Sequence, residues 1–445
     1  MNIECARATL FRVLVVAVVG IGGYWAVPVA AETRMPTHCG DSGPGSLRDT
    51  VALSADGDTI DVSGIACTIL VTSGEIVIPQ NNLTIRGVRT DTLTEIRGDG
   101  SSRLLNHIGS GTLRLHAIAL GGGRHAANLA LGGCLYSEGH VELLDTAVGE
   151  CVAVGEGGLD PMALGGGVHA RTLLSRYSVF IVNSASGVNG NGGAISTEGR
   201  ATLFRTLIAR NTATNGGGVS ALGGATITYS TIEGNIAWHD NGGVQASGGS
   251  VTLNKSVLNN NRAVHRCGGL CVSGSGRTSV IDSTLFRNQA IYLGAGELSD
   301  DAEVLNSTIA FNEDTARREC VGAIRARQLR LQSSIVAKNL CFAEGQRAYD
   351  IGGRSWEGYT TTGHNNLVGR SRVKLPADTL SVDPRLGLLN RHGGPTSVLP
   401  LMADSPAINR GNNLNNRQYD QRGPGFPRVV GGRADIGAYE VQAGD

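Results

Sequence analysis

The sequence predicts an all-β protein built as a parallel β-helix, with a short helix capping its N-terminal end and an irregular C-terminal wrap. Three observations predict this fold class: a repeat of 24 to 28 residues through the middle of the chain, short alternating apolar segments within each repeat, and a high glycine content. Propeller blades need about 40 residues and four strands per unit. The repeat is too short for a blade and fits one full turn of a β-helix.

The composition excludes several other classes. Glycine supplies 65 of 445 residues, about double its usual share of roughly 7 per cent. The sequence has no Gly-X-Y repeat and only 12 prolines, which excludes a collagen triple helix. Charged residues make up 17 per cent and the net charge is zero, which disfavours disorder. Because 38 Lys and Arg balance 38 Asp and Glu, nucleic acid and anionic membranes are not expected partners.

The first 31 residues have the pattern of a secretory signal peptide. Arg7 and Arg12 precede an apolar run over 13–21, and small residues stand before Glu32. The alternative is a transmembrane anchor, but glycines interrupt the run and it falls short of the ~20 apolar residues that a span needs. We expect an exported protein with no membrane span after signal removal.

Residues 32–57 are expected to form an N-terminal cap. Within them, 45–53 reads as a short amphipathic helix with Ser46 as its N-cap and Asp49 three residues later, the spacing of a capping box with Asp in place of Glu. The open end of a solenoid exposes its core and unpaired strand edges, which such a helix would cover. Apolar segments from 59 onwards predict the first coils.

Two landmarks recur through the predicted coils, which we place at 58–375. The first is a Ser/Thr, x, apolar, x, x, Asn core, whose asparagines are Asn183, Asn211, Asn235, Asn261, Asn288, Asn312 and Asn339, with Cys151 in the same place one repeat earlier. The second is a Gly-Gly or Gly-Ala pair before an apolar residue, at 166–168, 193–195, 217–219, 242–244, 268–270 and 322–324. Identical positions of successive coils would stack about 4.8 Å apart.

Both landmarks are interpreted as scaffold. A corner Asn can hydrogen-bond its own backbone and that of neighbouring coils, and it tolerates the left-handed conformation. The Gly-Gly pairs are expected to supply corner dihedrals that a Cβ would forbid. The variable stretches between Asn and Gly-Gly, such as 238–240 and 264–266, are expected to form loops along one edge, where function would lie.

The cysteines predict disulfides. Cleavage after Ala31 would remove Cys5 and leave eight cysteines in an oxidising compartment. The positions within the coils favour the pairs Cys39–Cys67, Cys134–Cys151 and Cys320–Cys341, with Cys267–Cys271 as the remaining pair. The alternative for Cys267 and Cys271 is a metal site that includes His265, although a fourth ligand is not evident.

The repeats and the C-terminal segment resemble known families. The Gly-Gly-Ala-Ile at 192–195 and the Phe-x-x-Asn at 180–183 are similar to repeats of polymorphic outer-membrane proteins and bacterial right-handed β-helix proteins. Residues 376–445 resemble the choice-of-anchor Q domain of secreted bacterial β-helix proteins, in five ordered motifs at 383–387, 390–396, 405–411, 420–423 and 434–440.

The resemblance implies an exported protein of the pectin-lyase-like superfold, right-handed and associated with the cell surface. Since no hydrophobic tail follows Glu440, we expect free secretion, periplasmic residence or non-covalent surface association. From the residues themselves, Asp383, Asp420, Arg422, Asp435 and Glu440 are interpreted as turn caps and ion pairs of the wrap.

The fold alone does not indicate catalysis, so a catalytic site has to be sought in the residues. A hydrolase needs two or three carboxylates about 5–9.5 Å apart, and a lyase needs a base beside carboxylate-bound calcium. Glu233 and Asp282 have no carboxylate at the matching place of the next coil. Asp300 and Asp301, in an acidic cluster with Glu297 and Glu303, form a weak calcium candidate. His239 and Asp240 are not expected to act as a pair, because adjacent residues of an extended chain point apart.

We therefore predict a non-catalytic surface or extracellular binding protein, adhesin-like or contacting carbohydrate, and monomeric. The alternative is a polysaccharide lyase or glycoside hydrolase of the pectin-lyase-like superfold. No catalytic residue and no cofactor is assigned beyond the calcium candidate.

Overall fold

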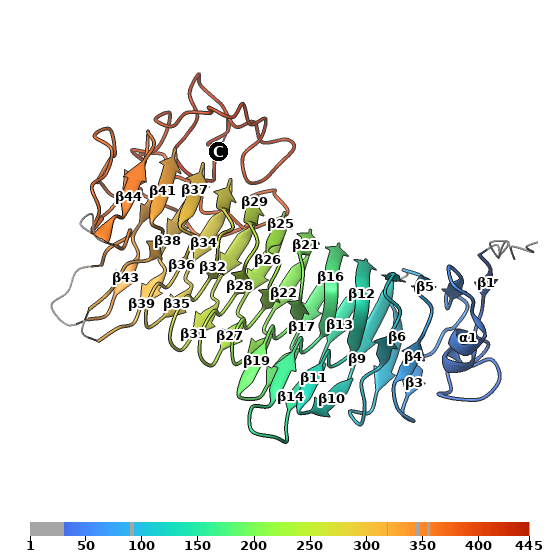
Figure 1. Cartoon of the computed structure of the whole chain (residues 1–445). Helices are drawn as coiled ribbons and strands as arrows, with labels where there is room; N and C mark the ends of the chain where they lie inside the picture. The colour runs from blue at the N-terminus through green and yellow to red at the C-terminus, as the bar shows by residue number, and fades with distance from the viewer. Residues whose placement is uncertain (1–30, 90–92, 318, 344–347, 354–356, 445) are drawn as a thin grey trace, which may run out of the picture. The chain divides into compact units, whose positions relative to one another are not determined.

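The computed structural model describes residues 31–89, 93–317, 319–343, 348–353 and 357–444. The signal peptide expected over 1–31 and Cys5 lie outside these residues, except for Ala31. The described residues form a right-handed parallel β-helix, which confirms the predicted fold class (Figure 1). A single α-helix occurs among them, and no helix in these ranges is long and apolar enough to cross a membrane.

The coils contribute strands to three long parallel sheets and, in three coils, to a fourth. A 12-stranded sheet contains β3 (Ile69–Val71), β6 (Thr94–Gly98), β9 (Ile118–Gly121), β13 (Ala147–Gly149), β17 (Val179–Ile181), β22 (Leu207–Ala209), β26 (Thr231–Glu233), β30 (Val257–Asn259), β34 (Thr284–Phe286), β38 (Thr308–Ala310), β42 (Ile335–Ala337) and β45 (Leu367–Val368).

A 9-stranded sheet follows it around the coil. Its strands are β10 (Arg124–Ala127), β14 (Val152–Gly155), β18 (Ser184–Ser186), β23 (Thr212–Ala213), β27 (Ile236–Ala237), β31 (Arg262–Ala263), β35 (Gln289–Ala290), β39 (Glu313–Asp314) and β43 (Leu340–Cys341). Longer loops of three coils add a 3-stranded sheet of β11 (Leu129–Leu131), β15 (Met162–Leu164) and β19 (Asn189–Asn191).

The remaining sheet has 21 strands, because most coils enter it with two successive segments. Its strands are β1 (Thr33–Arg34), β2 (Thr59–Asp61), β4 (Ile76–Ile78), β5 (Leu83–Arg86), β7 (Leu105–His107), β8 (Thr112–His116), β12 (Leu135–Leu144), β16 (Val168–Arg176), β20 (Ile195–Thr197), β21 (Ala201–Phe204), β24 (Val219–Ala221), β25 (Ala225–Thr228), β28 (Val244–Ser247), β29 (Val251–Asn254), β32 (Leu270–Ser273), β33 (Thr278–Ile281), β36 (Gly296–Glu297), β37 (Asp301–Leu305), β40 (Ile324–Arg325), β41 (Gln328–Gln332) and β44 (Thr360–Thr362).

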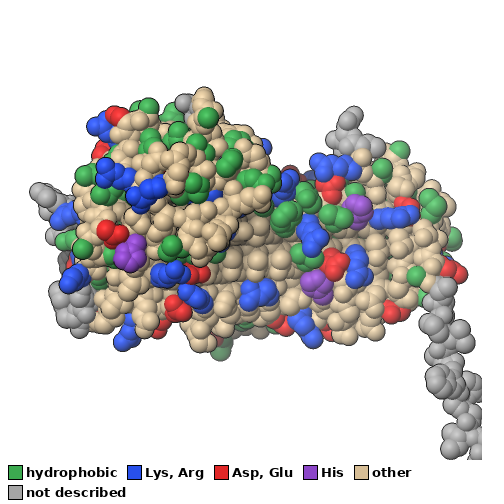
Figure 2. Space-filling view, turned by 90° about the horizontal axis from the view of Figure 1, so that it is seen from above, with side chains coloured by type: hydrophobic (Ala, Val, Ile, Leu, Met, Phe, Trp, Pro, Cys, Tyr) green, Lys and Arg blue, Asp and Glu red, His purple; other side chains and the backbone are tan. Residues whose placement is uncertain are grey.

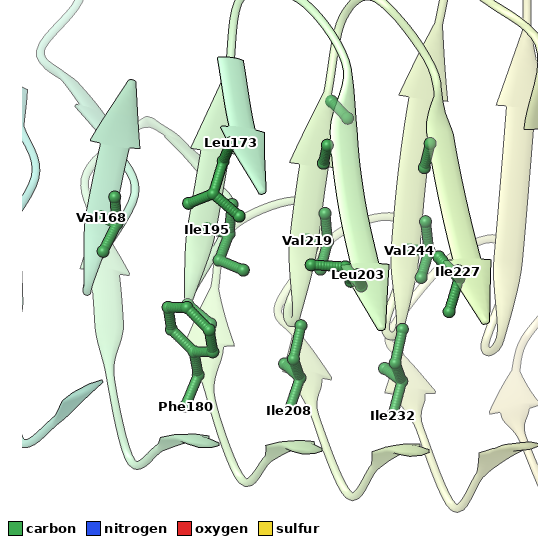
Figure 3. Packing of buried hydrophobic residues seen from close by; sticks show 14 of the residues in the cluster. Val168, Leu173, Phe180, Ile195, Leu203, Ile208, Val219, Ile227, Ile232 and Val244 are labelled. Carbon is green, nitrogen blue, oxygen red and sulfur yellow. The ribbon is translucent and has the colours of Figure 1, made fainter. Parts of the chain in front are cut away.

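The core is formed by the inward-pointing side chains, which alternate with outward-pointing ones along these strands. In β21 and β25 every second side chain is buried, and parallel register places each on its counterpart in the next coil. One column runs through Val168, Ile195, Val219 and Val244, and another through Phe180, Ile208 and Ile232 (Figure 3). Each coil thus buries apolar area against both neighbours, so the solenoid is stabilised by stacking along its axis.

The N-terminal helix α1 (Leu47–Leu53) covers the first coils. Ser46 is its N-cap and accepts from the Asp49 main-chain N–H at 3.1 Å, while Asp49 accepts from the Gly45 N–H at 2.9 Å. Leu47 and Val51 are buried in the same core as the first strands. The helix therefore closes the apolar end of the solenoid.

The asparagines form a continuous buried column. Each Nδ2 donates to Oδ1 of the Asn in the next coil at 2.9 Å, from Asn183 through to Asn339. The same Oδ1 accepts the main-chain N–H of the preceding Asn. At the far end Asn339 donates to the Asp350 carboxylate at 2.7 Å. Burial raises the pKa of Asp350 to about 6.

The corner conformations differ from the expectation. The left-handed residue is not the Asn but the residue before it, as at Arg210, Asn260 and Phe311. The Gly-Gly pairs also have another role, because Gly217 and Gly218 have ordinary φ angles. A Cβ on Gly217 would lie 2.5 Å from the Gly242 carbonyl oxygen, so these glycines permit close stacking of successive coils.

Four disulfides join the described cysteines. They are Cys39–Cys67, Cys134–Cys151, Cys267–Cys271 and Cys320–Cys341. Because Cys267 and Cys271 are bonded to each other, they offer no thiolate for the metal site considered from the sequence.

The C-terminal segment returns over strands of the later coils (Figure 1). Ile436, Ala438 and Tyr439 pack in a second apolar cluster with Ile335 of β42 and Leu367 of β45. This contact makes the segment part of the same folded unit as the coils.

Charged side chains brace this segment, within itself and against one coil. Asp420 accepts from Arg422 through both carboxylate oxygens, and the Arg422 guanidinium lies 4.0 Å and 3.9 Å from the ring centres of Phe426 and Tyr439. Asp435 accepts the N–H groups of Asn409 and Val441. Glu440 accepts those of Val430 and Asp435. Asp383 accepts the Arg385 N–H and pairs with Lys338.

Candidate functional site

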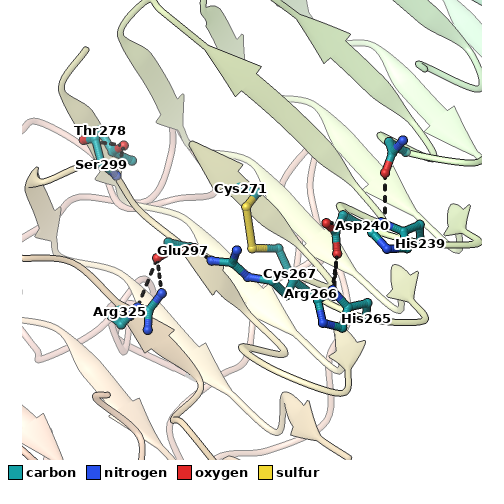
Figure 4. The surroundings of a disulfide bond; sticks show 11 residues. His239, Asp240, His265, Arg266, Cys267, Cys271, Thr278, Glu297, Ser299 and Arg325 are labelled. Carbon is teal, nitrogen blue, oxygen red and sulfur yellow. Dashed lines mark hydrogen bonds and ion pairs between the residues drawn. A yellow bond between two sulfur atoms is a disulfide. The ribbon is translucent and has the colours of Figure 1, made fainter. Parts of the chain in front are cut away.

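The variable loops of three successive coils meet at one edge of the solenoid. His239 and Asp240 follow β27, His265 and Arg266 follow β31, and Tyr292 follows β35. Isolated parallel bridges join Asp240 to Arg266 and Arg266 to Tyr292, so these loops stay in register although they are not regular strands. We call this group the loop-edge cluster; Figure 4 labels its members other than Tyr292.

The expectation that His239 and Asp240 point apart is wrong. The His239 Nδ1 lies 3.3 Å from the Asp240 Oδ2, because the chain bends at 238–239 and is not extended there. Asp240 also contacts the next coil, where His265 Nδ1 lies 3.0 Å from its Oδ1. The Asp240 carboxylate therefore contacts the imidazoles of both His239 and His265.

Charged residues continue beside this group. Glu297 pairs with Arg266 of one coil and Arg325 of another, and the Arg325 Nε lies 3.0 Å from its Oε1. Asp240, Arg266, Glu297 and Asp300 line a polar cleft of about 660 Å³ next to the Cys267–Cys271 disulfide.

The acidic cluster is divided between two places. Glu297 and Asp300 line the cleft. Glu303, on β37, accepts from Arg277 and Ser279, and the Asp301 carboxylate lies 3.7 Å from Arg277. The arginines thus neutralise most of the carboxylates that the calcium candidate would use.

Glu233 and Asp282 stand where the repeat placed them. Glu233 pairs in register with Ala209 and Asn259. The Asp282 carboxylate is buried against Lys255, whose Nζ is 3.1 Å away, and Arg417. Neither residue faces a second carboxylate at its place in the neighbouring coils.

A second exposed feature was not found from the sequence. Tyr177, Phe204 and Tyr229 form a stripe along three coils, with ring centres 5.6 Å and 6.1 Å apart and edge-to-face contacts. The Arg205 guanidinium lies 5.7–5.9 Å from all three ring centres. Tyr177 is 47% exposed, whereas burial raises the pKa of Tyr229. We call these three residues with Arg205 the aromatic stripe.

The stripe borders a hollow of about 340 Å³. Leu174, Tyr177 and Phe204 line it together with threonines of β21 and β25. Seen from above, hydrophobic side chains gather beside the raised C-terminal segment, while acidic and basic side chains are intermixed on this face (Figure 2). The available signal was that scarce aromatics stand one or two residues before the Ser/Thr of three consecutive repeats.

No family model matches the sequence, and neither does any curated protein.

Proposed function

We propose that this chain is an exported binding protein that contacts carbohydrate through the outer face of the solenoid and does not cleave it. The aromatic stripe carries this proposal. Sugar rings present apolar C–H faces and polar edges, and aromatic rings offer a matching apolar surface with polar tips. A hollow lined by aromatic and apolar side chains with a few polar groups is typical of small-ligand sites. Because the stripe runs along the axis, it suits an elongated ligand.

The proposal includes export. Disulfides persist in oxidising compartments, and the described residues carry four of them. The N-terminal pattern of a signal peptide and the resemblance of 376–445 to the choice-of-anchor Q domain support the same location, in the periplasm, in the medium or loosely held at the cell surface. An adhesin-like role and a monomeric state belong to this proposal.

A glycan array followed by calorimetry tests the binding. We expect a saturable glycan ligand whose affinity falls about tenfold in Tyr177→Ala, which corresponds to about 1.4 kcal/mol. Trp238→Ala is the matched control, because Trp238 is 65% exposed and lies outside the stripe. Binding that is unchanged in Tyr177→Ala and Tyr229→Ala, or the absence of any glycan ligand, would contradict the proposal.

Cleavage of a polysaccharide at the loop-edge cluster is the second candidate. The observation that favours it is the His265–Asp240 contact beside Glu297, since a carboxylate that orients an imidazole is a common arrangement for a general base. A degradation screen over uronate and neutral polysaccharides separates the two. Depolymerisation that is lost in His265→Ala or in Asp300→Ala/Asp301→Ala would replace the binding proposal by an enzymatic one.

A further inference from the structure

Two histidines occupy the same position in successive coils of the loop-edge cluster. The His265 main-chain N–H donates to the His239 carbonyl at 2.8 Å, and the bridge from Asp240 to Arg266 fixes the register of the two loops. The two imidazole centres are 5.3 Å apart and their planes are inclined by 31°. The coil repeat therefore places both rings on the same side of the edge.

Asp240 lies beside both rings (Figure 4). Its carboxylate oxygens are 3.3 Å from His239 Nδ1 and 3.0 Å from His265 Nδ1. The main chain holds this carboxylate in place, because Oδ1 accepts the Arg266 N–H at 2.9 Å and the Asp240 N–H donates to Asn215 at 3.3 Å. One ligand atom from each of the three residues lies within 4.8 Å of the others.

We propose that His239, Asp240 and His265 bind a divalent transition-metal ion of the zinc class. Ligand atoms on a tetrahedral zinc ion with bonds of about 2.0–2.1 Å lie roughly 3.3 Å apart. The contacts of 3.0 Å and 3.3 Å, which reach the two different oxygens of Asp240, are of that size, and a bound ion would take the place of the Nδ1 protons. Two imidazoles with one carboxylate favour Zn²⁺, Ni²⁺ or Cu²⁺ over Ca²⁺ and Mg²⁺, which prefer oxygen ligands.

The exposure of the two imidazoles and the charges around them are compatible with a metal ion at this site. The side chains of His239 and His265 are 61% and 44% exposed, so an ion reaches the ring nitrogens and keeps positions open for water or a ligand. Glu297 neutralises Arg266, the nearest guanidinium along the chain, and so reduces its repulsion of a cation.

The neighbouring group of Cys267, Cys271 and Glu297 is the weaker choice. Its two cysteines are joined in a disulfide, and Glu297 is held by two arginines. A zinc ion would have to displace the arginines to reach a carboxylate with no thiolate beside it. The histidine site is therefore the one that the geometry assigns.

Calorimetric titration of the oxidised, chelator-treated protein with ZnCl₂ tests the site. We expect one Zn²⁺ per chain and an affinity at least tenfold weaker in His239→Ala and in His265→Ala. Asp240→Asn, which keeps an acceptor for the Arg266 N–H, should weaken binding similarly. His116→Ala is the control, because His116 is an exposed histidine on β8 outside the cluster, and it should bind as the unaltered chain does.

Circular dichroism confirms that each variant is folded before titration. Absence of saturable Zn²⁺ binding overturns the proposal. The same holds if His239→Ala and His265→Ala both keep the affinity of the unaltered chain, or if CaCl₂ competes with Zn²⁺ at equal concentration. Because no glycan enters this titration, its result is independent of the carbohydrate proposal.

Discussion

The Lys255 ammonium donates to the Asp282 carboxylate of the next coil, with 3.1 Å between Nζ and Oδ2. Lys255 also donates to the main-chain oxygens of Tyr419 and Asp420 in the C-terminal segment. Burial lowers the pKa of Lys255, and the negative charge of Asp282 opposes that change. This buried pair joins two coils to the segment that covers them.

Replacing Lys255 by Met should release the C-terminal segment from the coils. Removing one partner of a buried pair costs up to about 3–5 kcal/mol, and here the Tyr419 and Asp420 carbonyls lose their donor while Asp282 keeps Arg417 as a partner. We expect this loss in urea unfolding, together with faster proteolysis within 413–433. The exposed Lys338–Asp383 pair also links a coil to the segment, so Lys338→Met is the control and should cost less than about 1 kcal/mol. Equal losses in the two variants would contradict the anchoring role.

Asn235→Ala should interrupt the asparagine column. The change removes the acceptor of the Asn211 main-chain and side-chain N–H groups, and the donor to the Ile208 carbonyl. Because these groups are buried, we expect a loss of about 2–4 kcal/mol in the free energy of unfolding. Thr252→Ala, which alters a side chain between two buried residues of β29, should change it by less than about 1 kcal/mol. A loss of the same size in both would show that the column has no special contribution.

Gly217→Ala should be poorly tolerated although the φ angle is ordinary. The new Cβ would stand 2.5 Å from the Gly242 carbonyl oxygen and 2.6 Å from the carbonyl group of Ile236, and backbone atoms cannot move aside as a side-chain end can. We expect about 2–4 kcal/mol of destabilisation or a loss of soluble protein. At Gly64 the nearest atom is 3.6 Å away, so Gly64→Ala should be nearly neutral. A stable Gly217→Ala protein would mean that the coils can separate to admit a methyl group.

Stability should fall as the pH rises above about 7.5. Burial raises the pKa of Glu440 to about 8, so between its ordinary value of 4.5 and about 8 the folded protein binds one more proton than the unfolded chain. Glu440 then lowers the free energy of unfolding by up to about 1.4 kcal/mol per pH unit. Urea unfolding at several pH values measures this slope, which Glu440→Gln should flatten and Glu233→Gln should keep.

Below about pH 7.5 the opposite trend enters. Burial lowers the pKa of His107, His125 and His169, the last to about 4, so these rings stay neutral in the folded protein while the unfolded chain takes up protons. Their contribution to stability is lost as the pH falls from 6.5. Comparison with Glu440→Gln above about pH 7.5 therefore assigns the slope to Glu440, and a slope that survives in that variant would assign it to another group.

Removal of a disulfide should destabilise the protein more when the loop that it closes is longer. Cys39–Cys67 spans 28 residues, Cys134–Cys151 spans 17 and Cys267–Cys271 spans 4. Loop entropy gives losses of about 3–4 kcal/mol for the first two pairs and about 2 kcal/mol for the third. Unfolding of the three double Cys→Ser variants measures them. Equal stability in all three and in the unaltered chain would contradict a structural role.

Much of the fold was predictable because each coil repeats the same constraints. Alternating apolar residues mark strands such as β21 and β25, and the spacing of the asparagines sets the coil length. The left-handed corner residues were not predictable. Closure of the coil imposes their conformation on side chains as different as Val182 and Phe311, neither of which signals it in the sequence.

The candidate site was less predictable. The sequence indicated the loop edge, since the repeat length varies there, but a bend at His239 reversed the expected direction of its side chain relative to Asp240. The aromatic stripe projects outward, where the core imposes no pattern. Its residues stand at slightly different offsets from the Ser/Thr position, and only the register of β16, β21 and β25 brings them together.

The asparagine column has a direction. Within the column, each interior side-chain amide donates to the asparagine of the coil after it and accepts from the asparagine of the coil before it, so every interior coil offers an acceptor to one neighbour and a donor to the other. If a whole coil were deleted or duplicated, each asparagine amide N–H would still face an asparagine carbonyl oxygen of the adjacent coil. The ends are specialised, because Cys151 contributes only its main-chain N–H and the Asp350 carboxylate accepts without passing a donor onward. Evolutionary change in the length of this solenoid is therefore compatible with the interior coils and not with the terminal ones.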